Sequence, residues 1–233
     1  MARRTDKIRD PESQARSRPG GRPGPAAIDI GSIVDVALRH FARAGFRDAR
    51  VQDIAAELGI SKGSIFKHFG SKEELFLAAY RRAASSLPAY MDAPGEFLDR
   101  GFFATVRYWL ERSEHLVHED WVSYRVVLIG NYASDLRIKQ RINRWLADED
   151  PYGTAAFVRF GLERGEIRAD VDVALMVSIV DWLMERFQDA LVTEELDPGL
   201  FAGRSVSDGA RERIDQFTTV LAGAVGLADG SAS

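Results

Sequence analysis

The side chains best suited to chemistry are concentrated between Ser61 and Lys72, where hydroxyl groups, lysines and a histidine lie close together. Such groups donate hydrogen bonds or carry positive charge, which suits them to phosphate oxygens and to the edges of nucleic-acid bases. Bond-breaking chemistry has less support, because the sequence contains no paired nucleophile and base, no glycine-rich phosphate loop and no metal-ligand set. The pattern therefore favours binding of an anionic polymer over catalysis.

Two short helices joined by a tight turn are expected to position these side chains. Apolar residues recur at helical spacing from about Arg50 to Leu58, and Gly59 can end that helix because glycine accepts the left-handed conformation. Ser61 is placed to cap a second helix over about Lys62 to Phe69. A helix, a glycine-containing turn and a second helix are typical of a DNA-binding helix-turn-helix.

Further helices are expected on both sides of this motif. An apolar stripe at 3.6-residue spacing predicts a helix over 28–44, closed by Gly45. Ser71, with Glu74 three residues later, has the pattern of a capping box that opens another helix. Residues 26–72 are thus expected to form a three-helix DNA-binding domain. Its small core is predicted to comprise Phe41, Phe46, Val51, Ile54, Leu58, Ile65 and Phe69.

The distribution of charge fits a basic end on an otherwise acidic chain. The formal net charge is −4, but residues 1–72 carry 14 Lys/Arg and 8 Asp/Glu, whereas the rest carries 17 and 27. Local charge decides binding, because screening limits its reach to roughly 8–10 Å in ordinary salt. Residues 1–25 hold seven Lys/Arg and four Pro and few large apolar side chains, so a disordered basic tail is expected there.

Beyond Pro88 the sequence predicts only helices. They are expected over about 95–112, 116–131, 134–164, 171–192 and 207–227, with the third broken near Asp150 because Pro151 follows it. The expected fold class is therefore all-α. A linker helix should join the N-terminal domain to a helical ligand-binding and dimerisation domain over 73–233.

Composition also limits location and cofactors. The chain has no cysteine, which fits a reducing cytosol, and no apolar run approaches the ~20 residues that span a bilayer, so a cytoplasmic protein without a membrane partner is expected. His115 and His118 could share a helix face beside acidic residues, but no third and fourth ligands accompany them. Neither a metal nor a cofactor is expected.

Residues 30–77 resemble the DNA-binding domain of the TetR/AcrR family of transcriptional regulators. The matching segments are Ile33-Val34-Asp35-Val36-Ala37-Leu38, Asp53-Ile54-Ala55, Leu58-Gly59-Ile60-Ser61-Lys62-Gly63-Ser64, Ile65-Phe66-Lys67-His68-Phe69 and Gly70-Ser71-Lys72-Glu73-Glu74-Leu75. The resemblance implies a homodimer bound to a palindromic operator, usually as a repressor. It also implies a small-molecule pocket among the C-terminal helices and a dimer interface from the last two long helices.

The DNA-contacting residues follow from the helix-turn-helix and from this resemblance. Two positions depart from the family pattern, with Phe66 in place of the usual tyrosine and Ala49-Arg50 in place of a Thr/Ser pair. Arg50 is expected to replace the lost phosphate contact, and Asp48 to take over part of the helix capping. The predicted DNA-contacting residues are Arg50, Ser61, Lys62, Gly63, Ser64, Phe66, Lys67, His68 and Lys72.

The C-terminal sites are predicted from aromatic content and helix order. Tyrosine and tryptophan offer an apolar body with a polar handle, which suits a largely apolar small-molecule effector. The predicted ligand pocket comprises Phe103, Arg107, Trp121, Tyr124, Arg125, Leu128 and Trp182. The dimer interface that the resemblance implies on the last two long helices is predicted to comprise Val177, Met184, Phe187, Phe217, Leu221 and Val225.

Three functions are compatible with these patterns. The favoured one is a ligand-responsive regulator, a homodimeric repressor released from its operator by a small molecule. A ligand-independent architectural DNA-binding protein differs from it in having a solid core instead of an internal cavity. An all-α enzyme is the third and is disfavoured, because no catalytic constellation accompanies the helix-turn-helix.

Overall fold

The structure, a computed structural model, describes residues 29–90, 95–193 and 206–227 of the chain. The helices are α1 (Ile30–Asp48), α2 (Val51–Glu57), α3 (Lys62–Phe69), α4 (Lys72–Ser86), the 3-10 helix η1 (Leu87–Tyr90), α5 (Gly95–Arg100), α6 (Phe102–Glu119), α7 (Trp121–Asn131), α8 (Leu136–Glu149), α9 (Thr154–Glu163), α10 (Val173–Val192) and α11 (Val206–Val225). The basic tail predicted over 1–25 lies outside the described residues.

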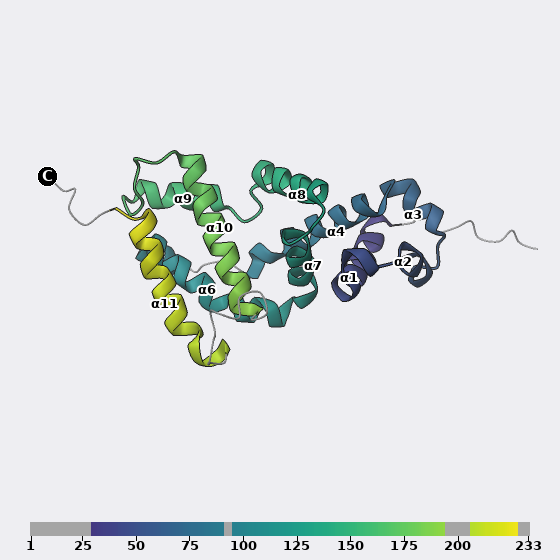
Figure 1. The fold of residues 1–233 in the computed structure, drawn as a ribbon, viewed down its shortest axis with the longest axis horizontal. Helices are drawn as coiled ribbons and strands as arrows, with labels where there is room; N and C mark the ends of the chain where they lie inside the picture. The colour runs from purple at the N-terminus through teal and green to yellow at the C-terminus, as the bar shows by residue number, and fades with distance from the viewer. Residues whose placement is uncertain (1–28, 91–94, 194–205, 228–233) are drawn as a thin grey trace, which may run out of the picture.

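The fold is all-α, as the sequence predicts. In the described ranges the only extended pairing is an isolated bridge between Ile167 and Gly226. Figure 1 shows an elongated arrangement in which α1, α2 and α3 lie at one end and α9, α10 and α11 at the other, with α4 leading from the first group into the second. None of the helices described is both long and apolar enough to span a bilayer.

Hydroxyl caps set the ends of the N-terminal helices. Ser61 accepts a hydrogen bond from the Ser64 amide at 3.0 Å and so starts α3 where predicted. Ser71 starts α4 in the same way, accepting from the Glu74 amide at 3.1 Å. The predicted capping box is only half formed, because the Glu74 carboxylate instead accepts from both terminal nitrogens of Arg141 on α8, one of them at 2.7 Å.

Glycine and aspartate break the C-terminal helices at positions that correct one prediction and confirm another. The single helix predicted over 95–112 is wrong, because Gly101 adopts φ +105° and separates α5 from α6. α6 then continues to Glu119, past the boundary predicted at 116. The break predicted near Asp150 is confirmed: its backbone is left-handed, and its carboxylate accepts from the Ala155 amide at 3.1 Å.

The hydrophobic core consists of two clusters. The first joins α1–α4 to α7 and α8, with Ile33, Phe41, Ile54, Ile65, Phe76 and Tyr124 among its buried members. Phe46, Leu58 and Phe69, also predicted for the N-terminal core, pack against it half-buried. The second cluster joins α6, α9, α10 and α11. Packing is therefore continuous between the helix-turn-helix and α7, across the domain boundary predicted after residue 72.

Close contacts reinforce the junction between the two ends of the molecule. Tyr80 of α4 donates its hydroxyl to the Asn131 side chain at 2.9 Å. A Cβ atom on Gly130 would lie 2.5 Å from the Tyr80 ring, so only glycine lets α7 approach α4 this closely. On the other side of the junction, Arg47 donates to the Ser134 hydroxyl at 3.1 Å.

Three acidic residues recur at every fourth position of α10 and face the protein interior. Asp189 is 4% exposed and accepts from the Tyr124 hydroxyl at 2.5 Å. Asp181 accepts from the Thr154 hydroxyl at 3.2 Å. Burial raises the pKa of Asp181, Glu185 and Asp189. For Glu185, burial together with repulsion from Asp189 and Asp181 raises the pKa to about 7. The sequence analysis did not anticipate this arrangement.

This arrangement predicts how the substitution Glu185→Gln affects stability at different pH values. The native carboxyl has a raised pKa and holds its proton at pH values where the unfolded chain, with an ordinary carboxyl pKa near 4.5, has lost it. The wild-type free energy of unfolding should therefore fall as pH rises from about 4.5 to 7. The variant lacks this contribution and should gain roughly 1–3 kcal/mol relative to wild type between pH 5 and pH 8.

Denaturant unfolding at the two pH values measures the difference. The control is Glu163→Gln at an exposed position of α9, which should follow the wild type at both pH values. A Glu185→Gln difference that does not change with pH would contradict the burial of an ionising carboxyl.

Candidate nucleic-acid interface

The turn between α2 and α3 is built from one glycine and one buried contact on each helix. Gly59 adopts φ +66° and reverses the chain after α2. The Ile60 amide donates to the Ala55 carbonyl at 3.0 Å, which closes the turn. Ile54 and Ile65 are fully buried and hold the two helices together. The helix-turn-helix thus has the geometry that the sequence predicts.

The outward face of α3 carries most of the predicted contact residues. Lys62, Gly63, Lys67 and His68 are exposed, whereas Ser64 and Phe66 are half-buried. A Cβ atom on Gly63 would meet nothing closer than the Ser61 hydroxyl at 3.6 Å, so the fold itself does not require glycine there. This face can therefore approach another molecule closely near the start of α3.

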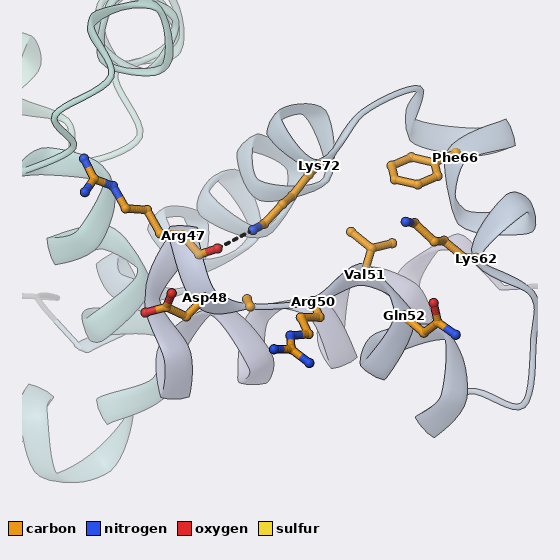
Figure 2. Close-up of a pocket in the computed structure, with 9 residues that line it drawn as sticks. Arg47, Asp48, Arg50, Val51, Gln52, Lys62, Phe66 and Lys72 are labelled. Carbon is orange, nitrogen blue, oxygen red and sulfur yellow. Dashed lines mark hydrogen bonds between the residues drawn. The ribbon is translucent and has the colours of Figure 1, made fainter.

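An open groove of about 660 Å³ lies beside this face, between α3 and the loop that leads into α2. Figure 2 shows the amino group of Lys62 pointing into the space between α3 and this loop, whereas the amino group of Lys72 points toward the Arg47 carbonyl. The groove is lined by Arg47, Asp48, Ala49, Arg50, Val51, Gln52, Lys62, Phe66 and Lys72. Arg50, Lys62 and Lys72 bring positive charge to the groove against the single carboxylate of Asp48, so the groove suits an anion.

Lys72 is held at the edge of the groove. Its amino group donates to the Arg47 carbonyl at 2.9 Å (Figure 2). The same group lies 5.0 Å from the centre of the Phe46 ring. Partial burial lowers the pKa of this ammonium, while Glu73 and Asp48 oppose that effect. Lys72 therefore joins the start of α4 to the end of α1 as well as presenting charge to the groove.

Lys62 and Phe66 interact one turn apart on α3. The Lys62 ammonium lies 5.4 Å from the centre of the Phe66 ring, within the range of a cation–π contact. Phe66 has no hydroxyl to donate, so at this position the ring acts through its face. The contact orients a cation toward the groove.

The predicted capping of α2 is wrong. Arg50 occupies the N-cap position and makes no side-chain capping bond, and Asp48 makes none in its place. Arg50 is exposed at the groove, with its side chain unconstrained by the helix end.

The groove includes residues that the sequence analysis missed. Arg47 lines it through its backbone, while its guanidinium turns away toward the loop after α7. Gln52 lies in the first turn of α2 and is exposed. The signal for both was their proximity to Arg50. Arg47 follows Gly45, whose φ of +72° breaks α1 at the residue where the sequence predicts its end, so Arg47 had been assigned to no helix.

The structure does not bring the predicted pocket residues together. Tyr124 and Leu128 are buried in the first core cluster, whereas Phe103 packs on the second. Trp121 and Trp182 are 44% and 63% exposed. The polar members point elsewhere: Arg107 pairs with Glu111 and Asp215, and Arg125 lies over the Trp121 ring.

Two of the predicted dimer-interface residues are buried within the protomer. Leu221 and Val225 are each 1% exposed and belong to the second core cluster. Phe187 and Phe217 stack on each other at 4.0 Å between ring centres, and Val177 and Met184 are half-buried against the same cluster. The apolar stripe read from the sequence thus marks mainly the inner face of α10 and α11.

The part of the chain that the structure describes contains no group of three or more His, Asp or Glu side chains able to hold a metal ion. The side chains of His115 and His118 lie outside that part.

Comparisons with known proteins agree with this geometry. Residues 33–79 match the family model for bacterial regulatory proteins of the tetR family. The chain is 26% identical over 185 residues to the HTH-type transcriptional repressor AcnR of Corynebacterium glutamicum, covering 78% of this chain and 92% of that protein. It is 29% identical over 164 residues to the repressor KstR2 of Mycobacterium tuberculosis, covering 64% and 74%.

Solved structures share the fold over most of the chain. A TetR-family protein from Shewanella sp. PV-4 matches with a TM-score of 0.59 at 18% identity, covering 85% of this chain and 98% of that one. A TetR regulator from Chloroflexus aurantiacus matches with a TM-score of 0.53 at 22% identity, covering 85% and 96%. Residues 33–79 thus form the DNA-binding domain of the tetR family, and over most of its length the chain is similar to TetR-family transcriptional repressors.

Proposed function

We propose that this protein is a homodimeric repressor that leaves a palindromic operator when a small molecule binds among its C-terminal helices. The observation that carries the proposal is the exposed start of α3 beside a cationic groove, on a helix whose inner face is fixed by Ile65. The relatives AcnR and KstR2 are both repressors by name, which supports repression over activation of transcription.

The contacts at DNA divide between two kinds. Lys62, Gly63 and Ser64 lie in the first turn of α3, the part of a recognition helix that reads base edges. The remaining predicted residues supply cations, donors and a ring to the phosphate backbone on either side, namely Arg50, Ser61, Phe66, Lys67, His68 and Lys72. Such contacts set affinity and register, whereas the first turn sets sequence preference.

The dimer surface is proposed on the outer faces of α10 and α11, which lie side by side at the end away from α3 (Figure 1). Large apolar side chains are exposed there, including Trp182 at 63% and Val220 at 70%. Gly223 and Ala224 are exposed one turn beyond Val220, so another helix could pack closely at that point. This surface replaces the predicted contacts through Leu221 and Val225.

Release from DNA requires that the helical body change the positions of the two helix-turn-helix domains in the dimer. Half-sites in successive major grooves lie roughly 34 Å apart, so a dimer held off that spacing cannot seat both α3 helices. α4 is the mechanical link, since it packs on α1 and α7 through Tyr80 and its neighbours. A coupling of about 1–3 kcal/mol would change operator affinity about 5–150-fold.

Operator selection from random DNA tests the proposal together with the variant Val220→Asp. The wild type should be a dimer in solution and should select a palindrome of roughly two helical turns. The variant places a charge in the proposed interface and should become monomeric, losing roughly 10²-fold or more in operator affinity. Sizing by light scattering and gel-shift titration measure the two effects.

The control for that experiment is Ala156→Asp on the exposed face of α9, which should stay dimeric and keep its affinity. A wild-type monomer, or selection of no palindromic sequence, would refute the proposed function.

The substitution Gly63→Ala separates the fold from the approach to DNA. Alanine is free of clashes within the protein and favours a helix by up to about 1 kcal/mol, so the free energy of unfolding should stay the same or rise. Operator affinity should nevertheless fall, because the added methyl group keeps the backbone from the base edges. Unchanged operator affinity would exclude Gly63 from the contact surface.

The salt dependence of DNA binding tests the phosphate contacts. Lys67→Ala should lower affinity for operator and unrelated DNA alike, and should reduce the slope of log K against log salt by about 1. Lys72→Ala should do the same and also destabilise the fold, because it loses the bond to the Arg47 carbonyl. Arg159→Ala, exposed on α9, serves as the control, and an unchanged slope in Lys67→Ala would refute its assignment.

A further inference from the structure

The interior of the helical body contains a row of carboxylates for which DNA binding gives no reason. Asp181, Glu185 and Asp189 lie at every fourth position of α10 and therefore share one face of the helix, about 6 Å apart along its axis. We call them the α10 carboxylate row. Asp181 and Glu185 are half-buried and Asp189 is 4% exposed, so the row runs from a reachable end to an enclosed one.

Hydroxyl groups meet the row but leave part of it unsatisfied. Thr154 donates to Asp181, and Tyr124 donates to one oxygen of Asp189. The other oxygen of Asp189 is buried with no hydrogen bond of good geometry, and so is the Thr193 hydroxyl one turn further along. The Tyr132 hydroxyl lies close enough to lower the pKa of Asp189 without forming such a bond. Leaving a buried acceptor unpaired is unfavourable by about 1–3 kcal/mol or more for a charged group, so a donor belonging to another molecule would complete the site.

The row also lacks a bound counter-charge. Across the described ranges, none of its carboxylates forms an ion pair within 4 Å. Lys139 and Arg186 act on Glu185 and Asp189 from a distance, but Lys139 donates to the Asn131 carbonyl at 2.6 Å and Arg186 to the Tyr132 hydroxyl at 2.9 Å. Burial accordingly raises the pKa of all three carboxyl groups.

We propose that the α10 carboxylate row binds an aliphatic di- or polyamine, and, resting on the function proposed above, that this amine is the effector. Ammonium groups supply both the positive charge and the hydrogen-bond donors that the row lacks. The nitrogens of an extended diamine lie about 6 Å apart with four methylenes and about 7.5 Å apart with five, so the shorter matches one helical step of the row and the longer exceeds it slightly. The effector is thus cationic rather than largely apolar as predicted from the aromatic content.

The spacing of the row also favours an extended cation over a metal ion. One metal ion needs its ligands within about 2–2.6 Å, whereas these carboxylates follow one another along the helix axis. In agreement, the structure contains no cluster among its described side chains that could hold a metal.

Tyr80 of α4 lies within electrostatic reach of the row. Burial is the main cause that raises the pKa of the Tyr80 hydroxyl, and Tyr152 and the charges of Glu185 and Asp181 add to it. Tyr80 also holds Asn131 at the end of α7 and packs against Gly130. Neutralising the row therefore changes the electrostatic environment of the residue that couples α4 to α7.

Calorimetric titration of the full-length protein at pH 8 tests the site directly. The probes are a series of linear α,ω-diamines with three to eight methylenes, the triamine spermidine, n-butylamine and succinate. Among the diamines, the one with four or five methylenes should bind most tightly. Spermidine should bind more tightly than any diamine, and succinate should not bind. n-Butylamine should bind at least about tenfold more weakly than the diamine, since it satisfies one carboxylate only.

Variants separate the row from general attraction to an acidic protein. Glu185→Gln and Asp189→Asn should each weaken diamine binding at least about tenfold, whereas Glu163→Gln, exposed on α9, should leave it unchanged. Circular dichroism checks that each variant is folded, and either variant of the row suffices if the other unfolds. No diamine binding, or binding that both row variants preserve, overturns the proposal.

Gel shifts with the selected operator distinguish this proposal from the proposed function. Amines also compete directly for DNA phosphates, so the Glu185→Gln protein measures that background. Greater release from wild type than from the variant supports the amine as effector. Binding without such release overturns the effector role while the site stands. Operator release by a different small molecule, with no amine binding, overturns the amine site and leaves the proposed function intact.

Discussion

The packing of α1 against α4 and α7 is the constraint on which the rest of the structure depends. A helix-turn-helix of three short helices has little core of its own, and here Ile33, Phe41 and Phe76 are buried in a cluster that continues into α7 and α8. The orientation of α3 is therefore set by the helical body and does not depend on the stiffness of α4 alone. A head cut from the chain after residue 72 would expose apolar surface that α7 normally covers.

Charge is organised by position within this acidic protein. The groove at the start of α2 gathers Arg50, Lys62 and Lys72 within the reach that screening allows, so the negative total does not hinder an anion there. The opposite sign is concentrated on α10, in the interior of the body. Tyr80 belongs to the core cluster that joins the helix-turn-helix to α7 and α8.

Local signals explain which features the sequence could predict. α3 has its predicted bounds because the Ser61 cap and the glycines at 59 and 70 act on their own neighbours. The split between α5 and α6 could not be predicted from local sequence, because it involves Glu166. This residue is distant in sequence, and its carboxylate accepts a hydrogen bond from the Phe102 amide. Burial of Leu221 and Val225 inside the protomer, and of Asp189 beside Tyr124, likewise depends on which helices meet. Periodicity marks an apolar face but does not identify what covers it.

The contact between Gly130 and Tyr80 restricts how this protein can drift during evolution. Any larger residue at 130 would overlap the tyrosine ring and would also come within 3.0 Å of Ile142. A larger residue at 130 could be accepted only together with a smaller residue at 80. Replacing Tyr80 in this way would remove the hydroxyl that donates to Asn131. Positions 80, 130 and 131 should therefore vary as a group among descendants of this chain. A lineage that altered them would also have altered the contact through which α7 of the helical body positions α4 and the helix-turn-helix.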